Sequence, residues 1–156
     1  MQRRDFIVLG AAASSGARVW AHHGWSSFDQ DKPLYLEGKV ESVAWRNPHA
    51  ECKLRLAANL QLPADLAKRV VPAQSASVDA GRVLGAAKLP SRKDPVWELE
   101  FAPLTRMQAW NVAELKPGQA IAVIGYTFAG EKGEATLRVE YLFAGGLAYG
   151  LRSAPA

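Results

Sequence analysis

Alternating apolar and polar positions predict a chain made mainly of β-strands. Residues 49–56 alternate strictly, with polar side chains at the odd-numbered positions and apolar ones at the even-numbered positions. Residues 35–45 also alternate, but the pattern slips by one position near residues 41–42, which predicts a β-bulge in a long, bent strand. Asn47-Pro48 lies between the two segments and predicts a turn.

Three further segments have strand character, at residues 96–101, 120–128 and 134–143. Between the first and second of these, the apolar spacing in residues 104–112 predicts a short helix. A long bent strand, two more strands, a short helix and a final hairpin form the element order of an OB-like five-stranded barrel, which we expect to be partly open. A small β-sandwich is the alternative.

The segment between the second and third strands interrupts this rhythm. Residues 59–95 contain four prolines and many alanines and serines, so we expect an insertion at the periphery of the barrel. Short helices are predicted within it at residues 64–71 and 78–87. The whole pattern indicates one β-barrel domain over residues 22–146, followed by a C-terminal tail at residues 147–156.

The first 21 residues match a twin-arginine signal peptide. Arg3-Arg4 is followed after one residue by Phe6 and an aliphatic residue. The apolar stretch that follows is too short to span a bilayer as a helix, and Ala21 ends a plausible signal-peptidase site. We therefore predict export to the periplasm with cleavage after Ala21; an uncleaved anchor is the alternative. No later segment is apolar for long enough to cross a membrane.

Charge and cysteine content exclude two classes of protein. The formal net charge is +4, and residues 1–21 contribute half of it, so no basic surplus indicates nucleic acid as a partner. Cys52 is the only cysteine, which rules out an internal disulfide. Its apolar neighbours predict that Cys52 is a small buried side chain.

The three histidines are the best candidates for chemistry. Cleavage after Ala21 places His22 and His23 at the new N-terminus, and His49 opens the second strand on its polar face. An N-terminal amine with imidazoles supplies the nitrogen ligands that copper(II) prefers. Zinc is the alternative metal and needs a further ligand such as Glu51 or Asp29. A histidine at a turn also often does no more than hydrogen-bond the backbone.

The tryptophans allow a different class of function. Trp25 and Trp45 flank the histidines, whereas Trp97 and Trp110 are in phase with core positions. Aromatic side chains on an OB-type surface can stack on sugars or bases. Because export argues against nucleic acid as a ligand, this alternative is a cell-envelope module without metal that binds a glycan, a peptide or a partner protein.

No motif of an enzyme is present. The chain lacks a nucleophile elbow, a phosphate loop, a dinucleotide fingerprint and a Cys-x-x-Cys pair. Glu51, Glu98 and Glu100 lie on strands, and alternation predicts that all three are on the solvated face. We therefore expect a protein that is not an enzyme.

Several short motifs recur together in one group of proteins. They are His22-His23-Gly24-Trp25, Phe28-Asp29, Leu36-x-Gly38-x-Val40, Trp45-x-Asn47-Pro48-His49, Trp97 and Lys116-Pro117-Gly118-Gln119. In this combination the chain resembles a family of small exported bacterial proteins of unknown function. The resemblance extends over most of residues 22–146, outside the insertion. It implies an exported β-barrel domain and brings no activity with it.

Overall fold

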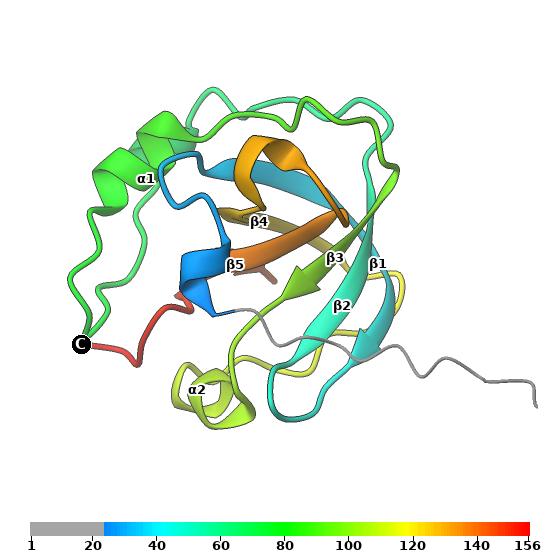
Figure 1. Ribbon diagram of the computed structural model, residues 1–156. Helices are drawn as coiled ribbons and strands as arrows, with labels where there is room; N and C mark the ends of the chain where they lie inside the picture. The colour runs from blue at the N-terminus through cyan, green and yellow to red at the C-terminus, as the bar shows by residue number, and fades with distance from the viewer. Residues whose placement is uncertain (1–23) are drawn as a thin grey trace, which may run out of the picture.

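The computed structural model describes residues 24–156, so the expected signal peptide, His22 and His23 lie outside the described residues (Figure 1). The elements in chain order are η1 (Trp25–Ser27), β1 (Leu34–Ala44), β2 (Glu51–Leu56), η2 (Leu66–Lys68), α1 (Ala80–Ala86), β3 (Val96–Glu100), α2 (Leu104–Ala109), β4 (Ala120–Tyr126), η3 (Ala129–Glu131), β5 (Thr136–Ala144) and β6 (Leu147–Gly150).

Strands β1 to β5 form a closed barrel. β1 pairs antiparallel with β2 and β4, β2 pairs with β3, and β4 pairs with β5. A parallel pairing between β3 and β5 closes the circle. The barrel is therefore closed, whereas the sequence led us to expect a partly open one. The strand order around the barrel and the helix α2 between β3 and β4 confirm the OB-like prediction, and the sandwich alternative is wrong.

Two features bend the strands enough to close the barrel. The register between β1 and β2 shifts between Val40 and Ser42, which confirms the predicted bulge. Glycines stand where neighbouring backbones approach most closely. A Cβ atom on Gly38 would lie 1.9 Å from the carbonyl oxygen of Arg55, and one on Gly125 would lie 2.2 Å from that of Arg138.

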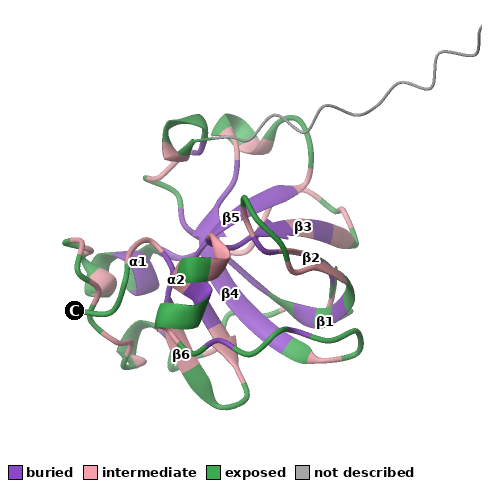
Figure 2. Cartoon of the chain, turned by 90° about the horizontal axis from the view of Figure 1, so that it is seen from below, coloured by how far each residue is buried: buried purple, intermediate pink, exposed green. Residues whose placement is uncertain are grey.

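The barrel interior is apolar and fully enclosed. It is filled by aliphatic side chains of all five strands together with Trp97 and Phe101. Cys52 belongs to this core with 3% of its surface exposed, which confirms the prediction for the lone cysteine. Figure 2 shows the buried residues concentrated on the strands and the exposed ones in the surrounding loops.

The segment between β2 and β3 lies outside the barrel and builds a second apolar cluster there. Leu66, Val83 and Leu84 pack against Tyr35 and Ile124 on the outer face of β1 and β4. η2 and α1 lie within the two helices expected from the sequence. Among residues 24–156, no helix is both long and apolar enough to cross a membrane.

The last ten residues, expected as a tail, pack against the barrel. Gly145 and Gly146 both have positive φ angles and reverse the chain, so that β6 pairs with β5. Leu151 is buried in the core. The chain then runs beside the segment between β2 and β3, where Gln74 forms a bridge with Pro155.

Candidate metal centre

His49 lies in the turn between β1 and β2, at one end of the barrel. The turn is held on both sides: the Leu104 amide donates to Asn47 Oδ1 at 3.1 Å, and the Ala50 amide donates to the Ala102 carbonyl at 3.0 Å. His49 lines a cavity of about 550 Å³ together with Glu51 and other residues of β1 to β3. The imidazole is therefore attached to a backbone that both flanking contacts keep in place.

A row of polar side chains crosses four strands beside this cavity. Glu51 on β2 is the register partner of Glu100 on β3. Glu100 is in turn the partner of Arg138 on β5, and Arg138 is the partner of Tyr126 on β4. Register partners point to the same side of a sheet. We call these four residues the cross-strand row. The cross-strand row lies on the outer face of the barrel. Its member on β2, Glu51, follows His49 by two residues along the chain.

Glu100 corrects the sequence-based expectation that it is solvated. Its surface is only 7% exposed, and its carboxylate pairs with the Arg138 guanidinium at 3.4 Å. Arg138 is 5% exposed, and burial lowers the pKa of its guanidinium. Alternation places Glu100 outside the barrel correctly, but contacts from a distant part of the chain cover the outer face at this point.

Trp25 supplies part of that covering. Its ring lies 5.1 Å from Cζ of Arg138 and 4.0 Å from Cζ of Arg152, and it meets the ring of Tyr126 edge-on at 6.2 Å. Arg152 is fixed in turn by the buried carboxylate of Glu140 at 2.6 Å. These cation–π contacts anchor the start of the described chain on the cross-strand row.

Glu98 gives the cavity an ionisable group with an unusual pKa. The side chain lines the same cavity as His49 and faces Lys53 across the β2–β3 pair. Burial, reinforced by the charge of Glu51, raises the pKa of Glu98 to about 7, although Lys53 acts in the opposite direction. The carboxyl therefore changes charge near neutral pH.

Glu98→Gln is expected to raise stability at pH 8 and to have little effect near pH 4. The pKa of Glu98 is higher in the folded chain than its usual value of 4.5, so the folded state binds the proton more tightly. Native stability from this group is present below pH 4.5 and is lost as the pH rises to about 7. After allowance for solvent screening, the variant should gain about 1 kcal/mol, or about 3 °C in Tm, at pH 8.

Thermal unfolding followed by circular dichroism from pH 4 to pH 8 measures this difference. Glu114→Gln, at an exposed position outside the cavity, is the matched control and should shift Tm by the same small amount at every pH. A Glu98→Gln effect that does not change with pH would contradict the raised pKa.

The two carboxylates predicted as additional zinc ligands, Glu51 and Asp29, lie in different cavities. Glu51 lines the cavity of His49, whereas Asp29 lines a different cavity and pairs with Lys32 at 3.5 Å. Burial raises the pKa of the Cys52 thiol to about 12, so it is protonated and is a poor metal ligand. Within residues 24–156, no three His, Cys, Asp or Glu side chains are grouped so as to hold a metal ion. A metal site here would need ligands from His22 and His23.

Each of the four tryptophans within residues 24–156 has a structural contact of its own. Trp97 is fully buried, and Trp45 packs against Phe101 with ring centroids 6.3 Å apart. Trp110 is half-buried and donates through Nε1 to the Ser153 carbonyl at 2.8 Å. Together with the arginine contacts of Trp25, these interactions account for the tryptophan content through packing.

Sequence reasoning missed the most unusual residue of this region, Arg138. The signal was present, because Arg138 and Glu140 interrupt a strand that is otherwise rich in apolar residues. Charged residues in such a strand indicate buried ion pairs. Their partners, Glu100 and Arg152, are too distant in sequence for any local pattern to identify.

The fold and the site define a small closed OB-type barrel with a histidine at one end and a cross-strand row of polar residues beside it. A model described as a family of unknown function (DUF6152) matches residues 11–61, a span that includes His22, His23 and His49. No curated protein and no solved structure matches the chain. The chain is thus similar, over its first third, to an uncharacterised family.

Proposed function

We infer that this chain is an exported protein that binds one copper ion through His22, His23 and His49. The observation that carries the proposal is the position of Trp25, only two residues after His23. The ring of Trp25 packs against Arg138, which pairs with the carboxylate of Glu100. Glu100 is the register partner of Glu51, and Glu51 lines the same cavity as His49.

The length of the intervening chain is compatible with a shared site. An extended chain covers at most about 3.6 Å per residue, so His22 and His23 extend only a short way from Gly24. Trp25 is anchored on Arg138, a member of the cross-strand row that also contains Glu51. A site shared by His22, His23 and His49 is therefore compatible with the length of the chain that joins them to Trp25.

Ligand chemistry favours copper over zinc. Processing after Ala21 would release an α-amine next to the imidazole of His22, and the two groups form a bidentate chelate. With one further imidazole, from His23 or His49, three nitrogens suit the tetragonal geometry of copper(II), which also has the highest affinity in the divalent series. Zinc would require a fourth ligand, and Glu51 is the carboxylate that lines the same cavity.

Isothermal titration calorimetry on protein that starts at His22 tests the proposal. We expect one copper ion to bind per chain at micromolar concentration or below. If neither copper nor zinc binds at that concentration, the metal proposal is wrong. A tryptophan fluorescence response to oligosaccharides or peptides, without one to copper, would favour the envelope-binding alternative instead.

Export has its own test. Replacing Arg3-Arg4 by two lysines is expected to abolish transport, because the twin-arginine pair is what the export machinery reads. Cell fractionation and mass spectrometry measure the outcome, and the unmodified chain should give a periplasmic species that begins at His22. Recovery of the lysine variant in the periplasm at the normal level would refute this route, and an intact precursor as the final species would refute cleavage.

A further inference from the structure

The pairing of β3 with β5, which we call the β3–β5 seam, is the shortest strand pairing in the barrel. Residues 98–100 of β3 lie in parallel register with residues 136–138 of β5. The antiparallel pairings among β1 to β5 each extend over five or six residue pairs. Parallel pairing is also slightly less stable per residue than antiparallel pairing. The β3–β5 seam therefore has the least main-chain pairing to hold it closed.

No turn joins the two strands of this seam. Parallel strands begin at the same end of a sheet, so a tight turn cannot connect them. In the chain, α2 and β4 lie between β3 and β5. Residues 91–95 lead into β3, and the link of residues 127–135 after β4 leads into β5. Contacts between these two segments must therefore hold that end of the seam together.

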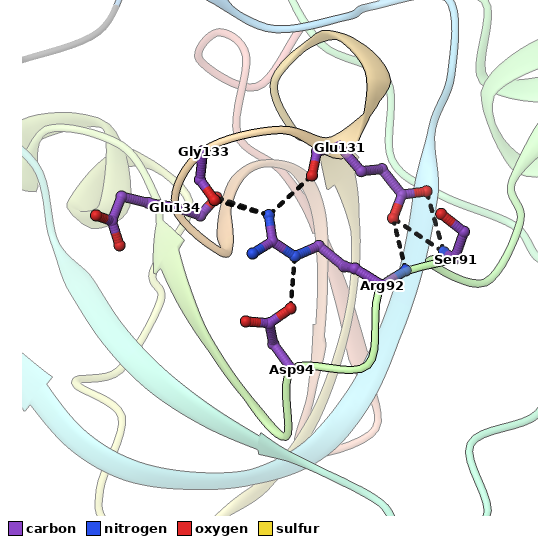
Figure 3. A network of polar contacts seen from close by, with 6 residues as sticks. All are labelled: Ser91, Arg92, Asp94, Glu131, Gly133 and Glu134. Carbon is purple, nitrogen blue, oxygen red and sulfur yellow. Dashed lines mark hydrogen bonds and ion pairs between the residues drawn. The ribbon is translucent and has the colours of Figure 1, made fainter.

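Arg92 fastens the two segments to each other (Figure 3). Its Nη1 donates to the carbonyl oxygens of Glu131 and Gly133 at 2.9 and 3.0 Å, and its Nε donates to Asp94 Oδ2 at 2.6 Å. In the opposite direction, the amides of Ser91 and Arg92 donate to the Glu131 carboxylate at 2.9 and 3.1 Å. We call these five residues the Arg92 clasp. The clasp does at this seam what a turn does between antiparallel strands.

The Arg92 clasp holds the link between β4 and β5 in a strained conformation. Glu131 has a φ angle of 53°, in the left-handed region that residues other than glycine rarely adopt. Both the carboxylate and the carbonyl of Glu131 accept hydrogen bonds within the clasp. Loss of the clasp would free Glu131 to leave the left-handed region, so the relief of strain favours release.

The other edges of β3 and β5 are paired independently of the seam. β3 pairs with β2 over its whole length, and β5 pairs with both β4 and β6. The two strands can therefore separate from each other without leaving the sheet. Leu99 and Leu137 are register partners across the seam, and both are fully buried in the core. Separation at this line would connect the apolar interior of the barrel with solvent.

We propose that the barrel opens locally along the β3–β5 seam and that the Arg92 clasp keeps it closed. The Glu98 amide donates to the Ala135 carbonyl at 2.8 Å, next to the clasp, and this bond breaks early in the movement. The Glu100–Arg138 ion pair, at 3.4 Å, lies at the far end of the paired residues and separates last. The movement needs no copper, so this proposal and the metal proposal stand or fall separately.

Native-state hydrogen exchange, followed by NMR, tests the seam in the unmodified chain. The reporter is the Glu98 amide, because it donates across the seam. We expect it to exchange at least about tenfold faster than urea unfolding of the whole chain allows, and with a weak dependence on urea, because local opening exposes little surface. Exchange at the rate set by global unfolding, with the same urea dependence, would overturn the proposal without any variant.

Two variants test the role of the clasp. Arg92→Met removes the guanidinium and keeps an unbranched side chain beside Trp97, whose ring lies 5.5 Å from Cζ of Arg92. The clasp is lost in the open seam as well as in the unfolded chain, so Glu98 exchange should accelerate about tenfold, by the same factor as global unfolding. Val83→Ala is the control, because the open seam keeps the second apolar cluster to which Val83 belongs. It should favour global unfolding and leave Glu98 exchange unchanged.

Two results with these variants would also overturn the proposal. Unchanged Glu98 exchange in a folded Arg92→Met chain would show that the clasp plays no part in the opening. An acceleration of Glu98 exchange by Val83→Ala as large as its effect on global unfolding would show that the seam opens only together with the rest of the barrel.

Discussion

His49→Ala is expected to weaken copper binding by about 100-fold or more in protein that begins at His22. His49 is the one histidine within residues 24–156, so no described imidazole can replace it. Changes outside the direct ligands of a metal already reduce affinity by about 10- to 100-fold, so loss of a ligand should do at least as much. Calorimetry and the electron paramagnetic resonance spectrum of copper(II) measure the effect.

Two further variants separate the site from its surroundings. Arg46→Ala changes a neighbouring side chain that lines the same cavity but offers copper no nitrogen ligand, and it should bind copper normally. One extra residue placed before His22 should weaken binding as strongly as His49→Ala, because it displaces the α-amine from the chelate. Equal affinity of the unmodified protein and the His49→Ala variant would exclude His49 as a ligand.

Alanine at Gly38 or Gly125 is expected to destabilise the barrel severely. At both positions the added methyl group would overlap a backbone carbonyl of the neighbouring strand, which no side-chain rotation can relieve. Forced overpacking of this kind costs about 3 kcal/mol or more, which lowers Tm by about 10 °C in a chain of this size. Thermal unfolding measured by circular dichroism gives the shift directly.

Gly85→Ala is the matched control for both variants. Gly85 lies in α1, and a Cβ atom there would meet no atom within 4 Å. Because alanine favours helix more than glycine does, the control should gain up to about 1 kcal/mol. A Tm for Gly38→Ala or Gly125→Ala within a degree of the unmodified protein would mean that the strands are farther apart than described.

The barrel was predictable because its strands are governed by local rules. Period-two alternation identified β1 and β2, and a single slip in that alternation located the bulge beside Val40. Proline and glycine positions identified the turns. β6 was missed because it has only four residues and follows two glycines, a pattern that also fits an irregular terminus.

The sites were less predictable because they depend on contacts between distant segments. Glu100 occupies an outward strand position but is buried, and it pairs there with Arg138 of a distant strand, against which Trp25 packs. The hydroxyl oxygen of Thr127 is buried without a hydrogen-bond partner among the described residues, which no local pattern in the sequence indicates. His49 was identifiable as a candidate, since histidine is rare in this chain, but its neighbours were not.

The parallel pairing of β3 with β5 also determines how the chain folds. Each antiparallel hairpin can form from neighbouring segments, but β1 must find β4, and β3 must find β5, across long intervening stretches. Such non-local pairings carry a large loop-closure cost before any contact repays it, and they slow folding. A chain emerging from the ribosome therefore cannot complete its barrel until β5 has been synthesised, and apolar strand edges stay open to misassociation until then.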